Sequence, residues 1–180
     1  DIPAAAEAIA VAGYFNSGQD CTAATRVLVH SSIRQDFVDA LSAQAREAKV
    51  GMPFEANVLC GPLNNSNQLS HVLGFLDRVP SHASVTAGGE QVGSSGYFVA
   101  PTVIAGLQQD DEMSQREVFG PVITVQEFSD ESEALGYANG VEYGLASIVW
   151  TVDVARAMRC ARDLDFGCVW VNTHIPIVAE

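Results

Sequence analysis

Short β-prone runs alternate with segments of helical spacing along this chain, and this alternation constrains the fold more than any other feature. We predict strands at residues 26–30, 84–87, 122–128, 146–151 and 168–171. We predict helices at residues 4–14, 33–51, 67–79, 130–139 and 153–164, and a shorter helical stretch within 110–117. Strands that alternate with helices of about ten residues or more form crossover units. The sequence therefore predicts an α/β fold with three layers, αβα, around a mostly parallel sheet.

Capping and breaking residues give three further expectations. Ser31 and Ser32 offer an N-cap for the helix that follows them. Pro101 interrupts the extended run at residues 97–104 and, because proline has no N–H to donate, predicts an edge strand or an irregular strand there. In open α/β sheets ligands bind beyond the carboxyl ends of the strands, and we expect the functional site at that edge.

Length and charge limit the possible partners. The 180 residues amount to at most one ordinary domain. Twenty-two acidic residues against nine basic ones give a formal net charge of −13, which argues against nucleic acid and against an anionic membrane. No apolar run approaches the roughly 18 residues that a membrane-spanning helix needs. The chain starts at Asp1 without a methionine and stops at Glu180 after an apolar run, so we expect both ends to be cut from something longer.

The four cysteines, Cys21, Cys60, Cys160 and Cys168, are scattered and include no CxxC pair. In a chain with an ordinary core composition and no secretion signal, this spacing favours free thiols in a reducing compartment. We therefore expect a cytoplasmic protein without disulfides. The missing CxxC spacing also argues against a structural zinc site, and we predict no metal ligands.

Cys21 is the candidate nucleophile. It lies between the Asn-Ser-Gly breaker that ends the first helix and the strand that begins at Arg26. Backbone N–H groups at such a junction favour the thiolate, and they can hold the oxyanion that forms when sulfur adds to a carbonyl carbon. The alternative is a buried cysteine that packs as a small hydrophobic residue.

The stretch Glu117-Val118-Phe119-Gly120-Pro121 is the second candidate. A glutamate beside an aromatic residue and a Gly-Pro turn could present a carboxylate to a ribose diol and a ring to a flat heterocycle. The alternative is an acidic residue at a helix end with a core phenylalanine behind it.

Four stretches in fixed order resemble the successive signatures of the aldehyde dehydrogenase superfamily. They are Gly-Gln-Asp-Cys-Thr-Ala at residues 18–23, Glu-Val-Phe-Gly-Pro at 117–121, Tyr-Gly-Leu-Ala-Ser at 143–147, and Gly167 followed by Val-Trp-Val-Asn at 169–172. Gly-Pro-Leu at residues 61–63 and the stretch at 96–102 fit the intervening parts of the family. The resemblance covers essentially the whole chain.

This resemblance implies the oxidation of a small-molecule aldehyde to a carboxylic acid with NAD or NADP as cofactor. Cys21 would attack the aldehyde to form a thiohemiacetal, which becomes a thioester that water hydrolyses. Glu117 matches the residue that holds the nicotinamide ribose, and Phe119 matches the one that packs beside the nicotinamide. The backbone N–H of Cys21 would form part of the oxyanion hole.

The resemblance also implies that residues 1–180 are the cysteine-bearing catalytic domain alone. It puts the family's N-terminal cofactor-binding domain, its general-base glutamate, its oxyanion asparagine and its C-terminal oligomerisation strand outside this chain. We therefore expect the fragment alone to be inactive. We expect the full-length protein to be a homo-oligomer, a dimer or a tetramer.

Within the family, residues 19–24 and 170–174 are most similar to the aminoaldehyde branch, the γ-aminobutyraldehyde and betaine aldehyde dehydrogenases. Asp20 could attract a cationic amine on the substrate, with roughly 1–4 kcal/mol of pair attraction depending on the local dielectric. Alternatively, Asp20 faces away and caps the turn. His174 lies in the last loop as a candidate substrate-binding residue, and its alternative is a place on the surface or behind the pocket.

Two other functions stay open. A thiol-dependent hydrolase or esterase would need a histidine within hydrogen-bond reach of Cys21, and the histidines are His30, His71, His82 and His174. A non-catalytic assembly fragment would use exposed apolar surface only. Because the resemblance puts the cofactor-binding domain and the oligomerisation strand outside this chain, we expect apolar patches or an unpaired sheet edge near residues 168–171.

Overall fold

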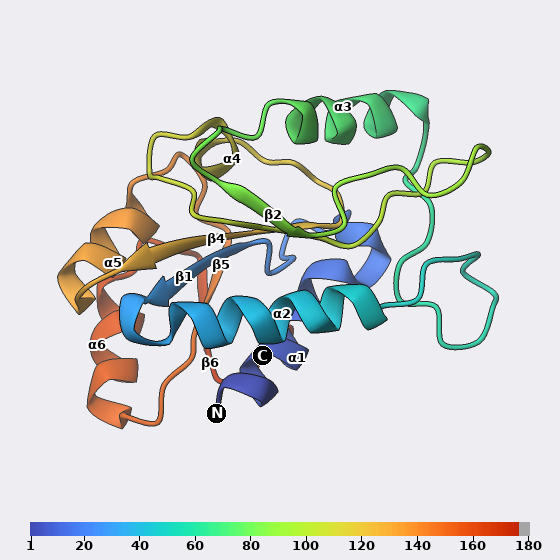
Figure 1. The fold of residues 1–180 in the computed structure, drawn as a ribbon. Helices are drawn as coiled ribbons and strands as arrows, with labels where there is room; N and C mark the ends of the chain where they lie inside the picture. Colours follow the sequence, from blue (N-terminus) through green and yellow to red (C-terminus); the bar gives the residue numbers. More distant parts are fainter. Residues whose placement is uncertain (177–180) are drawn as a thin grey trace.

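The computed structural model describes residues 1–176, which form a four-stranded sheet with helices on both faces and a smaller two-stranded sheet (Figure 1). The larger sheet contains, in spatial order, β1 (Arg26–His30), β4 (Val122–Phe128), β3 (Thr102–Ala105) and β2 (Ser84–Ala87). The first three strands run parallel, and β2 pairs antiparallel with β3. The α/β class and the mostly parallel sheet are therefore confirmed.

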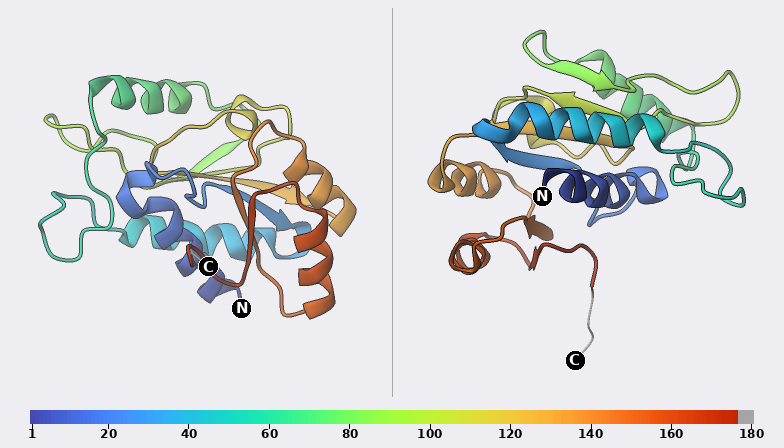
Figure 2. Two further views of the ribbon diagram at one scale, coloured as in Figure 1. Left: turned by 180° about the vertical axis from the view of Figure 1, so that it is seen from behind. Right: turned by 60° about the horizontal axis from the view of Figure 1, so that its bottom comes forward.

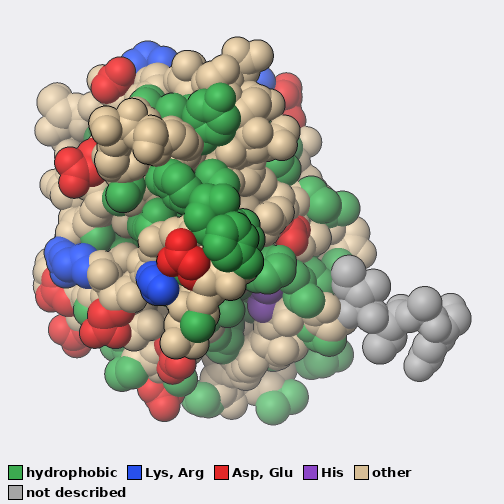
Figure 3. Space-filling view, turned by 90° about the vertical axis from the view of Figure 1, so that its right-hand side faces the viewer, with side chains coloured by type: hydrophobic (Ala, Val, Ile, Leu, Met, Phe, Trp, Pro, Cys, Tyr) green, Lys and Arg blue, Asp and Glu red, His purple; other side chains and the backbone are tan. Residues whose placement is uncertain are grey.

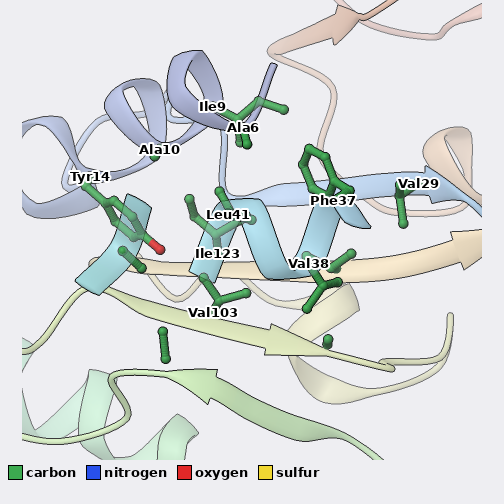
Figure 4. Packing of buried hydrophobic residues seen from close by; sticks show 14 residues of the cluster. Ala6, Ile9, Ala10, Tyr14, Val29, Phe37, Val38, Leu41, Val103 and Ile123 are labelled. Carbon is green, nitrogen blue, oxygen red and sulfur yellow. The ribbon is translucent and has the colours of Figure 1, made fainter. Parts of the chain in front are cut away.

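Helices cover both faces of the four-stranded sheet, so the fold has three layers: helices, sheet and helices (Figure 1). The covering helices are α1 (Ile2–Tyr14), α2 (Arg34–Glu47) and α3 (Ser66–Asp77). Ile123 and Val125 of β4 pack with α1 and α2 in one apolar cluster, in which Leu41 of α2 lies close to Ile123 (Figure 4). Val122 packs in the opposite cluster with Val72 and Phe75 of α3. This alternation follows from the two-residue period of a strand.

The last two strands form a separate unit. Within residues 1–176, β5 (Ala146–Val149) and β6 (Cys168–Val171) pair in parallel only with each other, beside α6 (Val154–Asp163) (Figure 2). The helix α5 (Glu131–Asn139) contacts β4 of the larger sheet. The sheet is thus divided in two. None of the helices in this described part of the chain is long and apolar enough to cross a bilayer.

The structure corrects three local expectations. The first turn after β1 is a 3₁₀ helix, η2 (Ser31–Ile33), whose N-cap is His30 and neither of the two serines. The helix α2 ends at Glu47, before the predicted end at residue 51. The strand β3 lies between β4 and β2, inside the sheet. It begins only at Thr102, so Pro101 precedes the strand and interrupts no ladder hydrogen bond.

Candidate active site

A tight reversal after α1 presents Cys21. The 3₁₀ stretch η1 (Phe15–Gly18) contains three consecutive left-handed residues, Asn16, Ser17 and Gly18, with φ of 50°, 58° and 68°. A turn then follows in which the Ala23 N–H donates to the Asp20 carbonyl over 3.1 Å. Cys21 occupies this turn as an exposed, free thiol. The alternative of a buried, core-packed cysteine is therefore wrong.

The backbone of the Cys21 loop touches the backbone of the Glu117–Pro121 segment. A Cβ at Gly18 would lie 2.0 Å from the carbonyl oxygen of Gly120, so only glycine fits there. The two loops meet because β1 and β4, which they precede, are parallel neighbours with Arg26 opposite Thr124. The fold thus joins two motifs that lie almost a hundred residues apart in the sequence.

This meeting point lies at the amino ends of β1 and β4, so the expected location at the carboxyl ends is wrong for Cys21 and Glu117. Figure 3 views the molecule from the side on which the arrows of β1 and β4 begin in Figure 1, and hydrophobic side chains gather in the middle of that face. The general rule for open sheets fails here because the chain places its unusual turns before the strands, where backbone strain and free polar groups accumulate.

The Glu117–Phe119 segment has no strand partner within residues 1–176, and side chains of α3 hold it. The Gln68 amide donates to the carbonyls of Phe119 and Val118, over 2.8 and 3.3 Å. The Nε2 of His71 lies 3.4 Å from the Glu117 carbonyl oxygen. Phe119 itself is left-handed, with φ of 52°, although it carries a side chain. The segment is therefore held in a shape that the backbone does not favour by itself.

A surface hollow of about 580 Å³ opens beside this segment. Glu117, Phe119, Tyr143, Phe75, Arg78 and Arg116 are among the residues that line it. The Glu117 carboxylate is exposed and accepts no protein hydrogen bond within residues 1–176, whereas its backbone N–H donates to the Tyr143 hydroxyl. A free carboxylate next to two aromatic rings suits a diol joined to a flat heterocycle, so these residues fit the nicotinamide-ribose end of a dinucleotide.

Asp20 caps the turn of the Cys21 loop. One carboxylate oxygen, Oδ1, accepts from both the N–H and the hydroxyl of Thr22, at 2.7 Å each. Its second oxygen has no hydrogen-bond partner in the described part of the chain. The capping alternative is therefore realised by one oxygen, while the other stays available to a ligand.

His174 lies half-buried after β6, and its ring stacks edge-on against Trp170 with centroids 5.1 Å apart. Neither ring nitrogen has a hydrogen-bond partner within residues 1–176. Burial lowers the pKa of His174, and the negative charge of Asp20 opposes that effect.

No histidine among residues 1–176 makes a hydrogen bond to the thiol of Cys21. His30 bonds to Ser32, His71 to the Glu117 carbonyl, and His82 to Asp111, while His174 is unpaired. The thiol-hydrolase alternative therefore lacks the base it requires in residues 1–176. The same residues contain no group of three or more His, Cys, Asp or Glu side chains that could hold a metal ion.

Several supporting residues escaped the sequence analysis. The Ser17 hydroxyl donates to the Gly61 carbonyl over 2.7 Å, and the side-chain oxygen of Gln19 accepts from the Asn64 N–H over 2.9 Å. Cys60 lies fully buried below this loop, and burial raises the pKa of its thiol to about 11. The sequence signals near these contacts were the Asn-Ser-Gly breaker, the signature at residues 18–23 and Gly-Pro-Leu at residues 61–63, and none of them indicated these hydrogen bonds.

Residues 1–180 match the aldehyde dehydrogenase family over their whole length, and the chain belongs to that family. It is 39% identical over 174 residues to a mitochondrial aldehyde dehydrogenase of Leishmania tarentolae, covering 96% of this chain and 35% of the relative. It is 38% identical over 166 residues to a chloroplastic betaine aldehyde dehydrogenase of Beta vulgaris, covering 91% and 33%. The chain thus spans about a third of the length of these curated relatives.

A crystal structure of betaine aldehyde dehydrogenase from Staphylococcus aureus in complex with NAD+ superposes with a TM-score of 0.96 at 34% identity. The match covers 100% of this chain and 37% of that one. An aldehyde dehydrogenase from Bacillus cereus gives a TM-score of 0.92 at 35% identity, covering 100% and 36%. The family resemblance and the fold predicted from it are confirmed.

Proposed function

We propose that residues 1–180 are the cysteine-bearing catalytic domain of an NAD(P)-dependent aldehyde dehydrogenase that oxidises an aldehyde to a carboxylic acid. The contact between Gly18 and Gly120 carries the proposal, because it sets the Cys21 loop beside the Glu117–Phe119 segment. Because the chain spans about a third of its relatives, the activity is proposed for a longer protein that supplies the remaining cofactor contacts and the base.

In this proposal the Cys21 sulfur adds to the carbonyl carbon of the aldehyde and forms a thiohemiacetal. The electron pair of the carbonyl bond moves to its oxygen, and the Cys21 N–H, which donates to no protein acceptor among residues 1–176, is available to hold that oxyanion. Water then attacks the Cys21 thioester, and the sulfur leaves as thiolate while the acid departs.

The cofactor, when bound, supplies the acceptor for the hydride that the thiohemiacetal loses as it becomes a thioester. Glu117 would accept hydrogen bonds from the ribose hydroxyls of the cofactor, and the Phe119 ring would pack beside the nicotinamide. Both side chains line the hollow, and the free carboxylate of Glu117 supports this assignment.

The test is a spectrophotometric assay of the complete protein with an aldehyde and either NAD+ or NADP+. We expect reduced cofactor to accumulate with the complete protein and none with the isolated 180-residue chain. A complete protein that reduces neither cofactor with any aldehyde, while hydrolysing esters, would instead favour the hydrolase function.

We propose an aminoaldehyde as the substrate, with Asp20 and His174 in the substrate pocket. The free second oxygen of Asp20 supports an attraction for a substrate amine, and named betaine aldehyde dehydrogenases are among the relatives. The variant Asp20→Asn tests this with little disturbance, because its Oδ1 can still accept from Thr22. We expect kcat/KM for 4-aminobutyraldehyde relative to butyraldehyde to fall about tenfold, which corresponds to about 1.4 kcal/mol. An unchanged ratio contradicts the proposal.

We further propose that the complete protein is a homo-oligomer and acts in the cytoplasm. The exposed residues Val152 and Val154 and the 38%-exposed Val171 on β6 support a surface that a second copy covers. Sedimentation of the complete protein tests the assembly, and a monomer at high concentration contradicts it. Cell fractionation tests the location, since named relatives include mitochondrial and chloroplastic enzymes.

A further inference from the structure

We propose that Gln19 and Gln68 are positioning residues that tie the two halves of the proposed site to one common support, the start of α3. This inference rests on the proposed function, because it concerns how Cys21 and the Glu117–Phe119 segment are held relative to each other. Neither glutamine needs to touch the substrate or the cofactor to act in this way.

The first tether comes from Gln68 in the first turn of α3. Its two amide hydrogens go to two successive carbonyls, those of Val118 and Phe119. The opposite orientation of the amide would face oxygen with oxygen, so only the donor end fits. These carbonyls belong to a segment without ladder partners, in which Phe119 holds a left-handed conformation. Such a conformation costs free energy and persists where surrounding contacts hold it.

The second tether comes from Gln19, two residues before the nucleophile. Its Oε1 accepts from the backbone N–H of Asn64, and its Nε2 donates to the Asn16 carbonyl within its own loop over 3.3 Å. The residue after Asn64 is Asn65, the N-cap of α3, whose side chain accepts from the N–H of Gln68. The two tethers are therefore joined through a single capped helix start.

The first two turns of α3 pack against the point where the two loops meet. A Cβ at Gly120 would lie 2.6 Å from the Cγ2 of Val72, the fully buried side chain one turn after Gln68. The same Gly120 meets Gly18 on its other side. The helix α3 thus contacts the Glu117–Pro121 segment, which in turn contacts the Cys21 loop. A displacement of one loop should therefore displace the other.

Amide hydrogen exchange in the complete protein without cofactor tests this coupling independently of activity. In Gln68→Met, which keeps the side-chain volume but removes both donors, we expect about tenfold faster exchange in residues 117–121 and also in residues 16–23, which Gln68 does not touch. In Gln19→Ala we expect the reciprocal effect on residues 117–121. Asn67→Ala, an exposed neighbour on the same helical turn, is the matched control and should change neither segment.

If each variant loosens only the segment that it contacts, the common support is disproved, whether or not the protein proves to be a dehydrogenase. A second readout covers variants that lose overall stability: Gln68→Lys restores donors and should return residues 16–23 to slow exchange. Failure of that rescue also overturns the proposal.

The kinetic counterpart uses the cofactor. In Gln68→Met we expect KM for the cofactor to rise about tenfold, and the cofactor-free cleavage of p-nitrophenyl acetate by Cys21 to fall by a smaller factor, because the Cys21 loop loosens as well. Asn67→Ala should change neither quantity. Unchanged ester cleavage in Gln68→Met would mean that Gln68 holds the Glu117–Phe119 segment alone, and would overturn the common support.

Discussion

The two ends of the four-stranded sheet carry hollows of the same volume, about 580 Å³, but their construction differs. At the amino ends, the loops before β1 and β4 hold left-handed backbone, an exposed thiol and a carboxylate without a protein partner among residues 1–176. At the carboxyl ends, several of the side chains that line the hollow pair with one another. Arg34 lies 3.2 Å from Glu127, and the Gln126 side chain donates to that of Gln109 over 3.3 Å.

This difference teaches that the loops, and not the sheet rule, decide where chemistry can occur. Unpaired polar groups and strained backbone cost free energy and persist where surrounding structure holds them. At the carboxyl ends the charged side chains of Arg34 and Glu127 pair with each other. The predictions below test whether function resides at the amino ends only, beginning with the largest expected effect.

Replacing Cys21, the proposed nucleophile, should have the largest effect. In the complete protein, Cys21→Ser should lower dehydrogenase activity by on the order of 10³-fold or more, because the hydroxyl is a far weaker nucleophile than the thiolate. The melting temperature should stay unchanged, because Cys21 is exposed. Cys168→Ser, at a half-buried thiol on β6, is the matched control and should retain activity. Loss of activity in both variants would remove the distinction between Cys21 and the other thiols.

The contact between the two loops should respond next. In Gly18→Ala the new Cβ would overlap the Gly120 carbonyl at 2.0 Å and would force a side chain into φ of 68°. We expect a loss of about 3 kcal/mol or more in the free energy of unfolding, measured by urea denaturation, from strain and overlap together.

Two other glycines separate these two causes. Gly93→Ala introduces the left-handed strain in open space, and Gly136→Ala introduces neither strain nor contact within α5. We expect a loss of about 1–2 kcal/mol for the first and no loss for the second. A Gly18→Ala variant no less stable than Gly93→Ala would contradict the close approach of the loops.

Much of the fold could be predicted because its signals are local. The strands β4 and β6 have the predicted bounds, since glycine and proline flank their apolar runs, and Asp130 and Asp153 cap α5 and α6 as expected. The central place of β3 and the division of the sheet depend on pairings between distant segments. Neither is encoded in a short window of residues.

The site divides in the same way. The residue types of Cys21 and Glu117 indicated a nucleophile and a cofactor-binding carboxylate, and both assignments stay predictions. Gln68 and His71 contact main-chain carbonyls, which any sequence provides, so no pattern of side chains could reveal them. The free ring nitrogens of His174 were equally hidden, because they depend on what surrounds the last loop.

The buried thiol of Cys60, below the Cys21 loop, should make the free energy of unfolding fall at alkaline pH. Burial raises the pKa of Cys60 from 9.0 to about 11, so the folded state favours the neutral thiol. This contribution is fully present below pH 9 and is lost as the pH rises toward 11, because the unfolded chain releases the proton first. The loss should reach about 2–3 kcal/mol.

The measurement compares the free energy of unfolding at pH 8 and at pH 10.5 for the wild type and for Cys60→Ala. The variant should lose less stability between the two pH values, since other groups contribute equally to both proteins. Equal losses would mean that water reaches the Cys60 thiol in the folded state and that the thiol ionises there as readily as in the unfolded chain.

The smallest effect is expected at the carboxyl ends. Arg34 and Glu127 form an ion pair between side chains that are 35% and 58% exposed, so solvent screens it. Glu127→Gln should cost less than about 1 kcal/mol of stability at low salt, and the difference should vanish at about 1 M salt.

Glu47→Gln, at an exposed carboxylate without an ion-pair partner in residues 1–176, is the control and should be neutral. Both variants should keep dehydrogenase activity within twofold, because neither contacts the amino-end loops. A tenfold loss in Glu127→Gln alone would show that chemistry or cofactor binding extends to the carboxyl ends, and the contrast between the two ends would then fail.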